Sequence, residues 1–289
     1  MKLNLFTSTL VGTLLLSVFS VLSPPSSEIT LTGDYLISTL VSNLMIVILL
    51  GVFIKKSSKR GLTLAFLVLA IHFVIGNFNL LIEAYIFNVT PRSETLELMA
   101  MGLVSTLITS PLLVLIFGRW NAAANEASHT KRSVLQWTWR IIAGNLLYVF
   151  FYLLAGFILY AVYPRLMDFY GDKIPELSVM INTQFFRALL FIGVAILIDR
   201  NVNLSLFYKA LLTGFIFSIV GGIAPLILPH DELMPAYIRF GHAFEVGFSN
   251  LLYGIILTYL IGQRTAAYDN ILSEIKNQVT GQAQYLNNI

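Results

Sequence analysis

The sequence contains no cysteine, and several familiar enzyme motifs are missing from it. The lack of cysteine excludes disulfide bonds, thiolate metal sites and cysteine nucleophiles within this chain. No HExxH zinc motif, GxSxG nucleophile elbow, Walker phosphate loop or glycine-rich dinucleotide fingerprint occurs. The sequence therefore predicts no cofactor and no metal site.

Charged residues are scarce as well. They make up 11% of the 289 residues, whereas 57% are hydrophobic and the mean hydropathy is +0.79. A soluble domain of this composition would have more apolar surface than it could bury. This balance indicates that the lipid bilayer is the solvent for most of the chain.

The hydrophobic residues fall into eight long, continuous stretches separated by short polar loops. A hydrocarbon core of roughly 30 Å needs about 20 helical residues to cross it, whereas a transmembrane strand needs a short segment with strict alternation. Continuous runs therefore predict an all-α, polytopic transmembrane bundle of about eight helices. The predicted spans are 6–22, 35–54, 62–87, 98–117, 141–162, 181–198, 206–228 and 237–261.

The two ends of the chain carry separate predictions. We expect one integral-membrane domain over residues 1–263 and a short cytoplasmic tail over 264–289, where apolar residues at helical spacing predict an amphipathic helix. The first span has a second interpretation, because a basic start at Lys2 followed by an apolar run is also typical of a signal peptide. Cleavage of residues 1–22 would leave seven spans in the same orientation.

The basic residues of the loops lie almost entirely on one side of the predicted spans. The opposite side carries only Arg92, Arg165 and Lys173. Cytoplasmic loops hold the excess of Lys and Arg, so we expect a multi-pass protein of the cell (plasma or inner) membrane with both termini in the cytoplasm. The pI near 9.0 then needs no nucleic-acid partner, and anionic lipids are expected at the basic inner loops. The basic side consists of Lys2, Lys55, Lys56, Lys59, Arg60, Arg119, Lys131, Arg132, Arg140, Arg200, Lys209, Arg264 and Lys276.

Polar residues inside three spans form series along single helical faces. At about 100° per residue, His72, Asn79 and Glu83 point in one direction in the third span. Gln184 and Arg187 share a face of the sixth span. Ionisable residues within a membrane are by default functional candidates, so we predict that these residues bind a substrate or an ion. The eighth span adds the longest series: Arg239, His242, Glu245, Ser249 and Asn250.

The depth of these residues predicts where they meet. A helix rises about 1.5 Å per residue, which places His72 near the midplane and the other ionisable members in the outer half. We therefore expect one cavity that opens to the extracytoplasmic side, with Arg187 bridging Glu83 and Glu245 as a pair or triad. The alternative is an ion-paired structural core, with residues near helix ends extending to the headgroups.

Two function classes follow from this cavity, and a third does not need it. The first is a transporter of a small solute or an ion, the second an intramembrane enzyme that acts on a lipid-linked substrate with Glu245 or Glu83 as general base. The third is a scaffold subunit of a membrane complex. Gly221, Gly222 and Pro225 predict a loosened or kinked seventh helix, and transporters use broken helices at substrate sites. Transport by a moving bundle is the preferred hypothesis.

Overall fold

The computed structural model describes residues 3–22, 31–122, 132–165, 168, 170–171, 174–229 and 234–262. The predicted tail over 264–289 lies outside these residues, as do Lys2, Lys131 and Lys173. Within the described residues the chain is helical, and β-structure is limited to one isolated bridge between Ser57 and Val202. The prediction of an all-α fold is confirmed.

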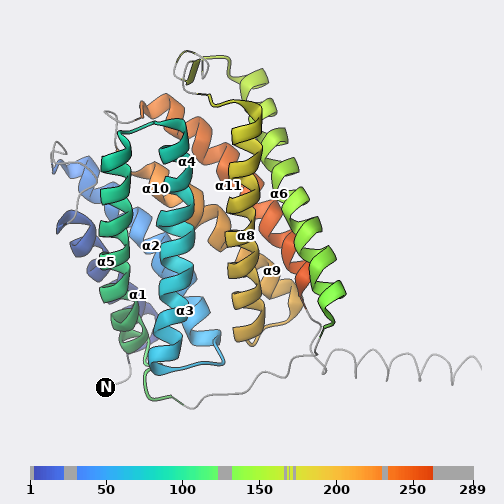
Figure 1. Cartoon of the computed structure of the whole chain (residues 1–289). Helices are drawn as coiled ribbons and strands as arrows, with labels where there is room; N and C mark the ends of the chain where they lie inside the picture. The colour runs from blue at the N-terminus through green and yellow to red at the C-terminus, as the bar shows by residue number, and fades with distance from the viewer. Residues whose placement is uncertain are drawn as a thin grey trace, which may run out of the picture.

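In the described part of the chain, eight helical segments are long and apolar enough to cross a bilayer, as predicted (Figure 1). The third and seventh are composite, because a short π-helix interrupts each of them. The remaining six are single α-helices. The bounds are α1 Leu5–Leu22, α2 Gly33–Lys56, α3 Gly61–Phe73 with η1 Val74–Phe78 and α4 Asn79–Phe87, α5 Arg92–Ile116, α6 Val134–Val162, α8 Leu177–Asn201, α9 Leu206–Phe215 with η3 Ile216–Ile223 and α10 Ala224–Ile227, and α11 Ala236–Ile261.

The helices form two groups of four spans. The N-terminal half, α1 to α5, is built on the pairs α1 with α2 and α3 with α5. The C-terminal half, α6 to α11, is built around α11, which packs on α6, α8, α9 and η3. The first span belongs to this packing, since Gly12 of α1 contacts Val47 of α2 and Leu113 of α5.

The core of the C-terminal half is close-packed and aromatic. The rings of Tyr148, Phe191, Phe217 and Tyr253 contact one another, with centroids 4.6 Å apart for Phe191 and Phe217 and 5.0 Å for Tyr148 and Tyr253. Nearby, α9 and α11 cross where both helices carry glycine, and a Cβ on Gly254 would lie 2.7 Å from the Cα of Gly214 in α9. Small residues permit such close approach of membrane helices, which fixes these elements to one another.

The two π-helices contact each other across the boundary between the halves, where α2 also packs on η3 and α10. Gly76 of η1 faces Val220 of η3, and Gly221 of η3 faces Ile75 of η1. The loosening predicted around Gly221 and Gly222 takes the form of this π-helix, whereas α11 is a regular α-helix throughout. π-helical turns are rare and are frequently found at functional sites.

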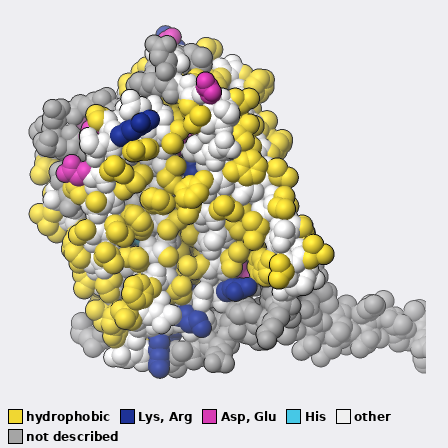
Figure 2. All heavy atoms as spheres, viewed as in Figure 1, with side chains coloured by type: hydrophobic (Ala, Val, Ile, Leu, Met, Phe, Trp, Pro, Cys, Tyr) yellow, Lys and Arg dark blue, Asp and Glu magenta, His cyan; other side chains and the backbone are white. Residues whose placement is uncertain are grey.

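The ends of the bundle differ in charge (Figure 2). We call the end where α2, α5, α8 and α11 terminate the basic face, since most of the described basic loop residues gather there, whereas Arg92 and Arg165 lie at the other end. Arg132 and Arg140 donate hydrogen bonds to the last carbonyls of α11, a favourable place for cations at a helix C-terminus. The surface between the two ends is predominantly hydrophobic (Figure 2), as expected for a multi-pass membrane protein.

The basic face also joins the two halves directly. Around the bridge, the Ser58 N–H donates to the Asn201 carbonyl at 2.7 Å, and the Asn203 N–H donates to the Lys56 carbonyl at 2.9 Å. These bonds connect the end of α2 to the end of α8. The halves are thus tied together at the basic face.

Candidate functional site

A cavity of about 610 Å³ lies between the two halves. Its wall is formed by side chains from most of the spans, and it includes Gly76 of η1 and Val220 of η3. At the end opposite the basic face it reaches Thr90 and Met234. Eight of the ten candidate residues line it: His72, Glu83, Arg187, Arg239, His242, Glu245, Ser249 and Asn250.

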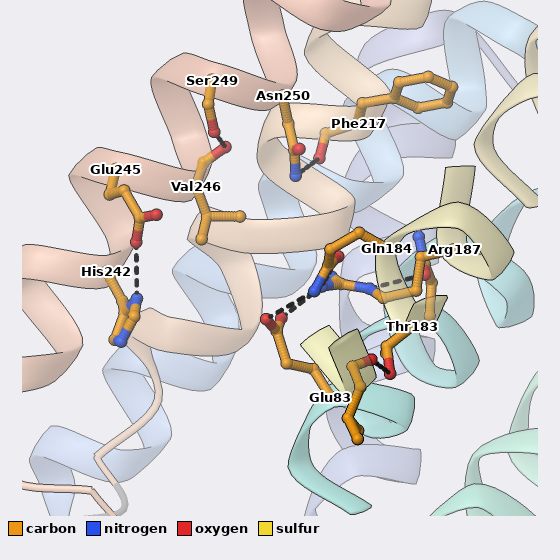
Figure 3. A network of polar contacts seen from close by, with 12 residues as sticks. Glu83, Thr183, Gln184, Arg187, Phe217, His242, Glu245, Val246, Ser249 and Asn250 are labelled. Atoms are coloured by element: carbon orange, nitrogen blue, oxygen red, sulfur yellow. Dashed lines mark hydrogen bonds and ion pairs between the residues drawn. The ribbon is translucent and has the colours of Figure 1, made fainter. Parts of the chain in front are cut away.

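Arg187 of α8 is the centre of a polar cluster that crosses from one half to the other (Figure 3). Its Nη1 donates to Glu83 Oε2 of α4 at 2.5 Å and to Gln184 Oε1 at 2.9 Å, and its Nε donates to Asn79 Oδ1 at 3.1 Å. The guanidinium also lies over the ring of Tyr148, 5.9 Å from its centroid. Asn79 and Gln184 do not line the cavity, and they hold the guanidinium from outside it.

A second polar chain runs along α11. His242 Nδ1 lies 2.8 Å from Glu245 Oε2, one helical turn away, and His242 Nε2 lies 2.6 Å from the hydroxyl of Tyr170. The two rings meet edge-on, with centroids 5.4 Å apart. Glu245 is therefore paired with His242, and Arg187 pairs with Glu83. Of the expected pair or triad, the described residues form the pair.

Tyr170 was not among the predicted site residues. It lies between α6 and α8 and is buried against Ile238. Burial raises the pKa of the Tyr170 hydroxyl well above its ordinary value, so this group stays protonated and can donate a hydrogen bond. A hydroxyl, an imidazole and a carboxylate in line form the arrangement by which a carboxylate orients a histidine base.

The remaining candidates make weaker contacts. His72 is 8% exposed and lines the cavity, and its Nδ1 has no hydrogen-bond partner within the described part of the chain. Asn250 Nδ2 donates to the Phe217 carbonyl in η3 at 3.4 Å, and Ser249 bonds its own helix through the Val246 carbonyl. Arg239 is buried near the start of α11 and faces the cavity.

Tyrosines of α6, which packs beside α11, form another part of the wall. Tyr148, Tyr152 and Tyr160 line the cavity, with Gly156 between them. These residues recur every four positions, which places them on one helical face. That spacing is visible in the sequence. Tyrosine is also common at membrane–water interfaces, so the spacing alone does not mark these residues as lining a cavity.

No group of three or more His, Asp or Glu side chains that could hold a metal ion occurs among the described residues. Comparison with protein-family models, curated proteins and solved structures gives no match, so no relative indicates an activity for this chain.

Proposed function

We propose that this protein is a membrane carrier that binds an amphipathic organic solute in the cavity between its halves and moves it by rocking one half against the other. The observation that supports this proposal is the position of the polar site: the Glu83–Arg187 ion pair joins the halves at the wall of the cavity. In many transporters the substrate site likewise lies between two bundles that move about it.

The size and lining of the cavity favour an organic solute over an ion. Pockets for small molecules span about 300 to 1,000 Å³ and combine apolar walls with a few placed polar groups. Here Leu80, Leu81, Phe151 and Phe157 are among the apolar lining residues, and charged groups come from α4, α8 and α11. A solute with an apolar body and a polar head fits this distribution.

In this proposal, the contacts between the halves rearrange when the halves move relative to each other. The interface includes two π-helices, and a cavity lies between the halves. The halves are tied at the basic face by the Ser57–Val202 bridge. In this proposal the basic face is cytoplasmic, the described state is closed there, and inward opening breaks the bridge.

The Tyr170–His242–Glu245 chain favours a second candidate, an intramembrane enzyme that acts on an amphipathic substrate in the same cavity. Its hydroxyl, base and orienting carboxylate are the parts that nucleophilic or acid–base catalysis requires. The two candidates differ in motion, because an enzyme of this kind needs a fixed cleft and a carrier needs two states.

Distance measurements between spin labels by double electron–electron resonance test the carrier proposal. The absence of cysteine allows spin labels at two exposed pairs: Ser93→Cys with Leu177→Cys at the outer end, and Lys55→Cys with Tyr208→Cys at the basic face. We expect two populations in lipid nanodiscs, with the outer pair closer when the basic-face pair is wider. One fixed distance for both pairs would contradict transport and favour the enzyme.

A further inference from the structure

The hydrogen-bond geometry of the Tyr170–His242–Glu245 chain fits either protonation state of the imidazole. Glu245 can only accept when ionised, so His242 Nδ1 carries a proton and donates it to Glu245. In a neutral imidazole, His242 Nε2, which lies 2.6 Å from the Tyr170 oxygen, accepts a hydrogen bond from the Tyr170 hydroxyl. In an imidazolium, Nε2 carries a proton and donates to the Tyr170 oxygen, once the hydroxyl has rotated.

We propose that His242 is the proton-binding site of the carrier, and that Tyr170 and Glu245 position it so that proton uptake is coupled to movement of the two halves. This inference rests on the proposed function. One proton from water at the outer end binds Nε2, the Tyr170 hydroxyl turns from donor to acceptor, and the His242–Glu245 pair changes from one negative charge to none. Release of the proton in the inward-open state reverses each step.

Burial and access are both suited to this exchange. The side chain of Glu245 is 10% exposed and that of His242 is 23% exposed, so the carboxylate is largely removed from water while the imidazole can still be reached. A neighbouring carboxylate favours a positive imidazolium, and burial of an unpaired charge opposes it, so the protonation state is sensitive to small changes of environment.

The groups around the chain connect it to the other half. Glu83 of α4 acts electrostatically on both His242 and Tyr170, and Tyr160 of α6 acts on Tyr170. Arg239 lies one turn before His242 on α11. Phe87 of α4 packs against the cluster that contains Tyr170. A new positive charge at His242 therefore attracts Glu83, which the described state pairs with Arg187 across the cavity.

The spin-label pairs defined above test this proposal when they are measured between about pH 8 and pH 5, the range in which histidine titrates. Coupling to one proton predicts that the ratio of the two populations changes by up to about tenfold per pH unit. We expect His242→Gln to abolish this response, and Glu245→Gln to move its midpoint to lower pH because the imidazolium loses its neighbouring carboxylate. Tyr170→Phe should move its midpoint without abolishing it, because the imidazole keeps its carboxylate but loses its hydroxyl partner.

The controls are His129→Gln and His230→Gln, which change histidines outside the described residues and should leave the response intact. A response that persists in His242→Gln, or that disappears in either control, would overturn the proposal. Two populations that do not depend on pH would also overturn it while leaving the carrier standing. A single population at every pH would instead overturn the carrier itself.

Discussion

Two buried ion pairs in this protein have similar chemistry but different surroundings: one lies within a single half, and the other joins the two halves at the cavity. Lys209 of α9 and Asp199 of α8 belong to one half, lie ten positions apart, and each side chain is 5% exposed. Arg187 and Glu83 belong to different halves, lie 104 positions apart, and Glu83 is 23% exposed at the cavity. The first pair holds two adjoining helices together, whereas the second borders the cavity and, in the carrier proposed above, separates when the halves move.

The largest expected effect is at the closed pair. Lys209 Nζ donates to the Asp199 carbonyl at 2.6 Å and to its Oδ1 at 3.1 Å, so Lys209→Ala leaves a carboxylate buried without its cation. Removing one partner of a buried pair costs about 3 to 5 kcal/mol. We expect a large fall in melting temperature in detergent.

The double variant Lys209→Met with Asp199→Leu is the control for the closed pair. It removes both charges and should recover most of the stability, because apolar replacements of buried pairs are often neutral. An unchanged melting temperature in Lys209→Ala would show that Asp199 is hydrated, and the contrast between the two pairs would be lost.

A smaller stability effect is expected at the pair between the halves. Arg187→Ala leaves Glu83 facing a cavity that can hydrate it, so the loss should be about 1 to 3 kcal/mol, the range for an unpaired buried polar group. Glu83→Gln added to Arg187→Ala should restore stability, and Glu245→Gln should not, because Glu245 is paired with His242. Rescue by Glu245→Gln would contradict the pairing described here. The distance populations should change in every variant that lacks Arg187.

The partner of Arg187 marks the limit of what the sequence could predict. Helical periodicity placed Glu83 and Glu245 at similar depths on faces that point inward, but helical rise and rotation do not determine which helix lies beside α8. The eight spans were predicted because length and hydropathy are local properties. The Lys209–Asp199 pair was missed because Lys209 was counted among the loop charges, and Tyr170 because its contacts with His242 depend on tertiary packing.

Glycine substitutions extend the comparison from charges to packing. A Cβ on Gly254 would lie 2.7 Å from the backbone Cα of Gly214 within one half, whereas a Cβ on Gly221 would lie 2.8 Å from the Ile75 side chain in the other half. A side chain can yield but a crossing backbone cannot. We therefore expect Gly254→Ala to lower stability by about 1 to 3 kcal/mol, the usual range for overpacking, and Gly221→Ala to lower it less.

Gly193→Ala is the matched control for these two substitutions. Gly193 lies in α8, and a Cβ there would meet no atom within 4 Å, so alanine should be neutral or stabilising by up to about 1 kcal/mol. Equal losses at Gly254 and Gly221 in thermal unfolding would show that the π-helix interface is as rigid as the interior of the C-terminal half.

The smallest effect is expected at a single hydrogen bond between the halves. Ser42 Oγ of α2 donates to the Ala224 carbonyl of α10 at 2.8 Å, and the serine is buried. Ser42→Ala removes about 1 kcal/mol from whichever state contains this bond, which is roughly a fivefold change in a two-state ratio. If the bond belongs to the described state alone, the population of the wider basic-face distance should rise by that factor.

Thr213→Val is the comparison. The Thr213 hydroxyl bonds the Lys209 carbonyl in its own helix, so its removal should leave the distances unchanged. Equal effects of the two substitutions would mean that the bond between α2 and α10 persists through the cycle, and the moving boundary would then have to lie elsewhere than between the N-terminal and C-terminal halves.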